Sequence, residues 1–335
     1  MFFIWCNIAC IGCDCLCRIY IYLNLPVICE GDTRLNKNIR TDLAMEAREL
    51  WKESTDETTK LLGVKAYEEI YGSFKVTTVN ILNEQGEKEL SKPVGKYVTV
   101  ELDGFIRREE NAFSKAVMLI ADELRDILNL EVTDTVLVAG LGNAAITPDA
   151  IGPEAISCVM VTRHLKERVP EYFAAFREVA AVQAGVLGTT GIESADLIAA
   201  VSGKMRPDAI IAVDALASCR MDRLCRTIQI SDTGIVPGSG VGNRRIALNR
   251  KTLGVPVIAV GVPTVVDAAS LAAEYTERAG IQGMSEAYFK QGEDMIVTPR
   301  EIDKNVRDMA KLIGYGVNAA LHDGLTIEDI DMFLS

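Results

Sequence analysis

Apolar and polar positions change their spacing at two points near the start of the chain. Residues 1–30 are mostly apolar, and residues 31–40 are polar or basic with no apolar period, which is typical of an exposed tether. Apolar side chains then recur on one face of the stretch 43–62, which predicts an amphipathic helix with Thr41 or Asp42 as its N-cap.

Alternating and β-branched stretches follow this helix. Residues 74–82 and 97–102 read as antiparallel strands, and turn chemistry at 83–86 follows the first of them. A helical stripe over 112–127 precedes the short apolar run 135–141, which has the length and content of a buried strand.

The same alternation of strand and helix continues to the C-terminus. It predicts an α/β fold in which a mostly parallel sheet is flanked by helices on both faces, with a small antiparallel strand addition. The chain shows no clear domain boundary after residue 40, so residues 43–335 are expected to form a single domain. The predicted downstream strands are 209–213, 227–230 and 256–262, and the predicted helices are 153–166, 193–201, 300–320 and 326–334.

Composition limits the possible partners. The 335 residues are 49% hydrophobic, which is enough to bury a large core, and the formal net charge is -12. Surfaces that neutralise phosphates or anionic lipids need an excess of Lys and Arg. Direct nucleic-acid binding and a membrane role are therefore disfavoured.

Cysteines crowd into the leader, residues 1–30. The body carries three more, Cys158, Cys219 and Cys225, which is typical of a reduced, cytosolic protein. The leader lacks the spacing of a zinc knuckle and the basic start of a signal peptide, and it is a poor membrane span. We interpret it as a variable or wrongly assigned translation start, with a weakly anchoring helix as the alternative. Its cysteines are Cys6, Cys10, Cys13, Cys15, Cys17 and Cys29.

Candidate chemistry lies in loops that follow predicted strands, because polar side chains of α/β sheets converge beyond the carboxyl ends of the strands. Asp149 lies in the loop 140–153, and Asp214 opens the loop 214–218. Two carboxylates in one cleft do not both ionise readily, so one can act as an acid and the other as a base toward water that attacks an amide. The alternative is that each Asp only caps a helix or holds a loop.

Two glycine-containing runs give weaker support for nucleotide or phosphate binding. The run Gly140-x-Gly142-Asn143 lacks the third glycine of a dinucleotide loop, and the run 238–242 lacks the Lys-Ser/Thr of a phosphate-binding loop. Gly142 and Asn143 of the first run and Gly238, Gly240 and Gly242 of the second are expected to be loop residues of the cleft. In a non-catalytic protein, the second run would instead bind an anion or a peptide.

Histidine chemistry and metal chemistry are also disfavoured. Neither His164 nor His322 lies in a strand-end loop, which counts against Ser-His and Cys-His hydrolases. Asp149 and Asp214 as ligands of a divalent cation would form an incomplete site without a nearby His. We therefore expect no metal and no organic cofactor.

Several longer motifs together resemble the germination proteases of spore-forming bacteria. The likeness runs from about Ile39 to the C-terminal helices, and the leader lies outside it. The motifs are Arg40-Thr41-Asp42-Leu43-Ala44, Gly140-Leu141-Gly142-Asn143, Thr147-Pro148-Asp149, Val213-Asp214-Ala215-Leu216-Ala217, Ile230-Ser231-Asp232-Thr233-Gly234, Pro237-Gly238-Ser239-Gly240-Val241-Gly242-Asn243 and Gly261-Val262-Pro263-Thr264-Val265-Val266-Asp267.

The resemblance implies a homotetrameric endopeptidase that is stored in the cytoplasm of the forespore and spore core as an inactive precursor. Such an enzyme degrades small acid-soluble spore proteins during germination, and its fold is similar to that of hydrogenase maturation proteases. The family's two proposed catalytic acids correspond to Asp149 and Asp214, and its self-processing site corresponds to the bond between Asp42 and Leu43. Residues 31–42 would then be the end of a propeptide. Alternatively, Asp42 only caps the following helix.

Overall fold

Long apolar runs form the parallel half of the central β-sheet. In this computed structural model, β4 (Val136–Leu141), β5 (Val179–Gly185), β6 (Ala209–Ala217) and β8 (Val257–Asp267) are parallel and lie in the order β5-β4-β6-β8. All six residues of β4 are buried, as expected for a strand that is covered on both faces. These strands place their carboxyl ends along one edge of the sheet.

An antiparallel half extends the sheet beyond β8. It contains β7 (Thr227–Ser231), β3 (Gly95–Glu101), β2 (Phe74–Ile81) and β1 (Val64–Tyr71), in that order away from β8. The short β9 (Ile296–Val297) pairs with the far end of β8. The predicted α/β fold with a parallel sheet and an antiparallel addition is confirmed.

The structure describes residues 41–53, 61–239, 242, 245–279 and 295–335, and these all lie within one unit, Asn36–Ser335. The side chains of Glu53, Glu277 and Arg278 are outside the description. The leader and tether predicted for 1–40 also lie outside the described residues. Among the helices that are described, none is long and apolar enough to cross a membrane.

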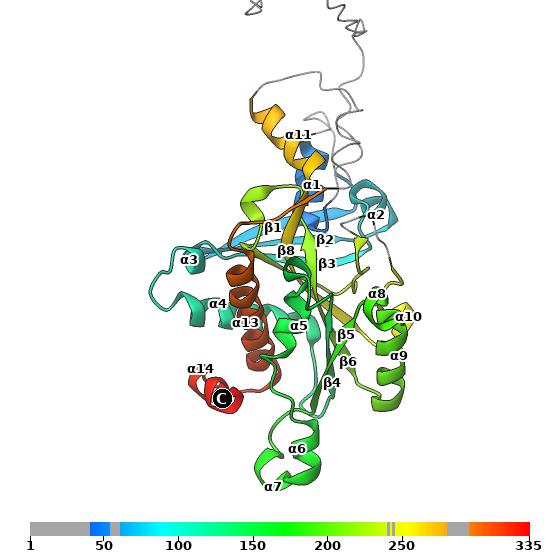
Figure 1. The fold of residues 1–335 in the computed structure, drawn as a ribbon, viewed down its shortest axis with the longest axis vertical. Helices are drawn as coiled ribbons and strands as arrows, with labels where there is room; N and C mark the ends of the chain where they lie inside the picture. Colours follow the sequence, from blue (N-terminus) through cyan, green and yellow to red (C-terminus); the bar gives the residue numbers. More distant parts are fainter. Residues whose placement is uncertain (1–40, 54–60, 240–241, 243–244, 280–294) are drawn as a thin grey trace, which may run out of the picture. The chain divides into compact units, whose positions relative to one another are not determined.

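Helices cover both faces of the parallel strands (Figure 1). On one face, α5 (Ile151–Ile156) packs on β4 and, together with α4 (Ala112–Leu128) and α13 (Ile302–Leu321), encloses an apolar cluster that includes alternate residues of β4, Val136 and Val138. On the other face, α9 (Ser194–Met205) packs on the intervening residues of β4. This alternation follows from the twofold repeat of a strand.

A third apolar cluster lies over the antiparallel strands. It joins the start of α1 (Ala44–Glu53) to α2 (Glu84–Leu90), β2, β3 and Leu216 of β6. Leu43, directly before α1, is fully buried in this cluster. The remaining elements are α3 (Asp103–Ile106), η1 (Thr147–Asp149), α6 (Arg163–Arg168), α7 (Pro170–Phe173), α8 (Leu187–Thr190), η2 (Met221–Arg223), α10 (Arg250–Leu253), α11 (Ala268–Arg278) and α14 (Ile327–Leu334).

Several element boundaries differ from the sequence predictions. The described part of the helix expected over 43–62 is α1, which runs to Glu53. Strand β1, which was not predicted, begins at Val64. The turn expected at 83–86 is the start of α2, because the Asn83 side chain accepts hydrogen bonds from the Gln85 and Gly86 amides. The helix expected over 153–166 is divided into α5 and α6.

The strand predicted at 227–230 is β7, which runs antiparallel to both β3 and β8. Strand β5 was not predicted. Its sequence, VAAVQAG, is rich in Ala and lacks the β-branched and aromatic residues by which strands are recognised.

Candidate active site

The loop after β4 holds Asp149 in a defined position. Gly142 has φ +101, and a Cβ atom there would lie 2.1 Å from the Asp149 carbonyl oxygen, so only glycine allows this approach. The backbone N–H of Asn143 donates to Asp149 Oδ2 at 2.8 Å and to the Asp149 carbonyl oxygen at 3.1 Å. Gly142 and Asn143 therefore position the Asp149 carboxylate.

Close backbone packing brings this loop against β6 and β8. A Cβ atom on Gly152 would lie 2.2 Å from the Leu141 carbonyl oxygen and 2.6 Å from that of Val213. The Thr264 hydroxyl, from β8, donates to the Pro148 carbonyl oxygen at 2.7 Å. Asp149 is thereby held beside the strand that carries Asp214.

Asp214 lies within β6, because that strand continues to Ala217. The prediction that Asp214 opens a loop is therefore wrong: its backbone pairs with Gly261 of β8, and its side chain is 5% exposed. The run of apolar residues that predicted this strand ends at Val213, because the next residue carries a carboxylate. The ladder of backbone hydrogen bonds continues beyond it. The Ala215 N–H donates to Asp214 Oδ1 at 2.9 Å.

The two carboxyl groups differ in burial and interact electrostatically. Burial raises the pKa of Asp214 well above its ordinary range, and the charge of nearby Asp149 raises it further. Burial also raises the pKa of the half-buried Asp149, while the Asn143 N–H lowers it. This difference favours a protonated Asp214 beside Asp149, which has more access to water.

The raised pKa of Asp214 predicts a pH-dependent cost in stability. Between the unfolded pKa of about 3.9 and the higher folded value, the folded chain holds a proton that the unfolded chain has released, so stability falls as pH rises. We expect Asp214→Asn to raise the free energy of unfolding at pH 7 by about 1.4 kcal/mol per pH unit of the shift. Urea unfolding at pH 7 and at pH 4 measures this, and a gain that is equal at both pH values would contradict it.

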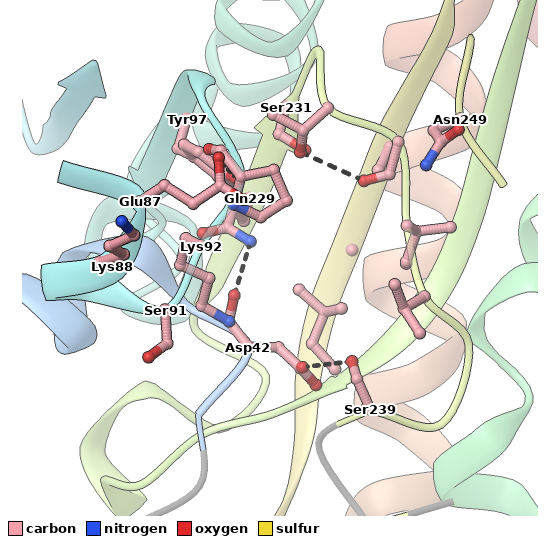
Figure 2. A pocket seen from close by; sticks show the side chains of 18 residues that line it. Asp42, Glu87, Lys88, Ser91, Lys92, Tyr97, Gln229, Ser231, Ser239 and Asn249 are labelled. Carbon is pink, nitrogen blue, oxygen red and sulfur yellow. Dashed lines mark hydrogen bonds between the residues drawn. The ribbon is translucent and has the colours of Figure 1, made fainter. Parts of the chain in front are cut away.

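Four hydrogen bonds hold Asp42 near β6, the strand that carries Asp214. Its N–H donates to the Ala217 carbonyl oxygen at 2.9 Å, and the Ala217 N–H donates to Asp42 Oδ2 at 2.9 Å. The Ser239 hydroxyl donates to Asp42 Oδ1 at 2.8 Å, and Gln229 Nε2 donates to the Asp42 carbonyl oxygen at 3.1 Å (Figure 2). The charge of Asp42 also contributes to the raised pKa of Asp214. The structure therefore brings Asp42, Asp149 and Asp214 into one electrostatic group.

A pocket of about 570 Å³ opens beside Asp42 (Figure 2). Its described lining includes Asp42, Lys88 and Lys92 but neither Asp149 nor Asp214. The described residues that line it are Asp42, Glu87, Lys88, Ser91, Lys92, Pro93, Tyr97, Leu216, Gln229, Ser231, Thr233, Gly234, Ile235, Val236, Ser239, Asn249, Ala259 and Gly261.

The glycine-rich loop contributes Ser239 to the site. Gly238 and Gly242 have φ +70 and +75, which are left-handed values that favour glycine, and the Gly242 N–H donates to the Ser239 carbonyl oxygen at 3.3 Å. Gly240 lies outside the described residues. The described part of this loop therefore turns so that Ser239 reaches Asp42.

Sequence reasoning missed Ser239 and Gln229, which bind Asp42, and also Glu46, which is fully buried at the start of α1. Ser239 belongs to the motif 237–243, but its partner Asp42 is distant in sequence. No sequence signal distinguished Glu46 from the other acidic residues of its helix.

Cys219 and His322 are poor candidates for catalytic residues. Burial raises the pKa of the Cys219 thiol, and the negative charge of Glu46 raises it further. This thiol is therefore a poor nucleophile. Burial lowers the pKa of His322 to about 4, and that side chain lies against Phe176. Across the described ranges, no group of three or more His, Cys, Asp or Glu side chains is arranged to hold a metal ion.

Comparisons with known proteins cover most of the chain. A sequence model described as "Germination protease" matches residues 44–278 and 275–334. The germination protease of Clostridium tetani is 42% identical over 324 residues, covering 89% of this chain and 100% of that protein. The germination protease of Oceanobacillus iheyensis is 38% identical over 353 residues, covering 87% of this chain and 96% of that protein.

A search of solved structures found a [NiFe] hydrogenase maturation protease, HycI from Thermococcus kodakarensis. It aligns with a TM-score of 0.33 and 16% identity, covering 58% of this chain and 98% of that one. Family membership rests on the sequence matches, which span most of the chain. The chain belongs to the germination protease family, and it is a protease.

Proposed function

We propose that this protease is made as a precursor that cleaves its own Asp42–Leu43 bond and then degrades small acid-soluble spore proteins. The observation that carries the proposal is the electrostatic interaction of two unequally buried carboxyl groups, Asp149 in η1 after β4 and Asp214 within the neighbouring strand β6. Such a pair can hold one proton while its other member is ionised.

In the proposed reaction, water is activated between the two acids. Asp149, which is the more accessible, takes a proton from the water as the water oxygen attacks the carbonyl carbon of the scissile bond. Asp214 donates its proton to the carbonyl oxygen, giving a neutral tetrahedral diol. Asp149 then returns its proton to the amide nitrogen as the C–N bond breaks, and Asp214 recovers its proton from the hydroxyl group. Across these steps every proton and bond is accounted for without a cofactor.

The binding of Asp42 supports self-cleavage at this position. Four hydrogen bonds fix the residue before the proposed scissile bond, and its charge contributes to the pKa of Asp214. The pocket beside Asp42 offers room for substrate residues next to the cleaved bond. Residues 31–42 would leave as the end of the propeptide, and residues 43–335 would remain as the peptidase domain.

The cellular setting belongs to the same proposal. We place the protein in the cytoplasm of the forespore and spore core, as a homotetramer whose partners are its own subunits and its protein substrates. The resemblance of the motifs to the germination proteases supports this setting, and the net charge of -12 disfavours direct binding to nucleic acid or to an anionic membrane.

Incubation of the purified precursor tests the proposal directly. At mildly acidic pH, we expect a shortened chain whose new N-terminal sequence begins with Leu43, identified by Edman sequencing or mass spectrometry. The same preparation should then cleave an added small acid-soluble spore protein. Asp42→Ala should slow self-cleavage because it removes the carboxylate that Ala217 and Ser239 bind. A precursor that stays intact under all conditions that support cleavage of added substrate would contradict self-processing.

A further inference from the structure

Glu46 has an unusual environment for a carboxylate, because its side chain is fully buried. It accepts hydrogen bonds from the Ser218 hydroxyl at 2.5 Å and from the Cys219 N–H at 2.8 Å. The Thr41 hydroxyl donates to Glu46 Oε2 at 2.5 Å, and Arg223 Nη1 lies 3.3 Å from Glu46 Oε1. A buried carboxylate persists only with such partners.

One of these partners lies on the other side of the proposed cleavage site. The Thr41 hydroxyl that donates to Glu46 also accepts a hydrogen bond from the backbone N–H of Leu43, at 3.0 Å. Cleavage of the Asp42–Leu43 bond would release Thr41 with the N-terminal segment and convert the Leu43 amide into an α-ammonium. The carboxylate would thus lose one donor while a cationic donor appears near the vacated position.

The Leu43 nitrogen and Glu46 have the spacing of a capping box. Leu43 precedes the first residue of α1, Ala44, so Glu46 is the third residue of the helix. A Glu at that position can reach back to the backbone nitrogen of the residue before the helix. Here the Thr41 hydroxyl bridges the same two groups, and its departure would leave the direct contact open.

The surroundings would retain the new N-terminus at this place. The Leu43 side chain is buried in the cluster over β2 and β3, and the Ala44 N–H donates to Gln229 Oε1 at 2.8 Å. An α-ammonium in a buried position, at the positive end of the α1 dipole, is unfavourable unless a carboxylate pairs with it.

Charge around Glu46 also fits an added cation. Arg223 faces two carboxylates, with Nη1 at 3.3 Å from Glu46 and Nη2 at 2.8 Å from Glu49. The three groups together carry one negative charge in excess, and one ammonium group would balance it. Lys92, which donates to the Thr41 carbonyl oxygen at 2.8 Å, would lose that acceptor on cleavage.

We infer that Glu46 is a buried binding site for the α-ammonium group of Leu43, which replaces the Thr41 hydroxyl once the chain is cut. The inference rests on the proposed cleavage site. Glu46 also binds Ser218 and Cys219, which directly follow β6, the strand of Asp214. Because the bonds between Asp42 and Ala217 leave with the propeptide, the new ion pair would hold the end of β6 in the mature enzyme.

The test makes the cut independently of self-processing. In the full-length chain, residues 39–42 are replaced by the factor Xa sequence Ile-Glu-Gly-Arg, so that the added endopeptidase leaves Leu43 as the N-terminus. The pH dependence of α-amine acetylation, followed by mass spectrometry of the N-terminal peptide, gives the pKa of the amine. We expect this pKa to lie at least about one unit above the ordinary 7.7–8.0.

Two variants make the result specific to Glu46. In Glu46→Gln the amine should titrate at or below the ordinary range and, at pH 8, react about fourfold faster or more, because a larger fraction of it is unprotonated. Glu84→Gln removes an exposed carboxylate of α2 and should keep the raised pKa. Moving the cut one residue earlier leaves Glu46 intact but displaces the amine, and the pKa should again return to the ordinary range.

An amine that titrates in the ordinary range in the parent chain would overturn the inference, as would a raised pKa that survives both Glu46→Gln and the displaced cut. Failure of the unaltered precursor to produce a Leu43 N-terminus would contradict the proposed self-processing instead. The two failures are therefore distinguishable.

Discussion

Replacing either Asp149 or Asp214 with Asn is expected to lower the rate of peptide-bond cleavage by about 10²–10⁴-fold, the usual contribution of a positioned acid or base. Asn keeps the size of the side chain but can neither take a proton from water nor donate one as a carboxylic acid. Both self-cleavage and cleavage of an added protein substrate should fall together, measured as initial rates by gel densitometry or mass spectrometry.

A matched carboxylate provides the control. Glu154 is exposed and lies in α5, close in sequence to Asp149, so Glu154→Gln should leave the rates within about twofold of the parent chain. Circular dichroism and the thermal unfolding midpoint should show that both Asn variants fold. A folded Asp214→Asn enzyme with full activity would remove Asp214 from the mechanism, and the same result for Asp149 would remove Asp149.

The second large effect concerns the backbone that positions Asp149. Gly142→Ala is expected to reduce cleavage by at least about 100-fold and to lower the free energy of unfolding by about 1–3 kcal/mol. The residue has φ +101, and an added Cβ would lie 2.1 Å from the Asp149 carbonyl oxygen, so the backbone of the loop must move. A displacement of about 1 Å at a catalytic group can cost about 10²-fold in rate.

Gly203→Ala supplies the comparison for this substitution. Gly203 is exposed in α9, and an added Cβ there would meet no atom within 4 Å. This change should raise stability by about 0.5–1 kcal/mol, because alanine suits a helix interior better than glycine, and it should leave activity unchanged. Urea unfolding and initial cleavage rates check both variants. Equal activity in Gly142→Ala and the parent chain would show that Asp149 does not depend on this contact.

Local sequence patterns were sufficient for most of the fold. The apolar run of β4 and the stripes of α4 and α13 matched their elements within a few residues, since these signals arise from the strand and helix repeats themselves. Patterns failed where the local signal was weak or interrupted, as in the Ala-rich β5 and at Asp214, where a carboxylate lies inside a strand.

For the candidate site, the motifs indicated Asp149, Asp214, Asp42 and Leu43 as residue types at defined positions along the chain. They did not indicate how the side chains meet. Ser239 binds Asp42, and Ser218 binds Glu46, across separations of 197 and 172 residues, so both contacts depend on the register of several strands.

The sequence alone therefore determined the family and the α/β class and indicated Asp149 and Asp214 as the proposed acids, because these depend on residue types and on the local repeats of helix and strand. Only the tertiary structure decided that Asp214 is buried within a strand, that Asp42 lies in its electrostatic field and that Glu46 is enclosed beside the Leu43 nitrogen. Burial and proximity between distant residues arise when the sheet assembles, and they set the pKa values and hydrogen bonds on which the chemistry depends.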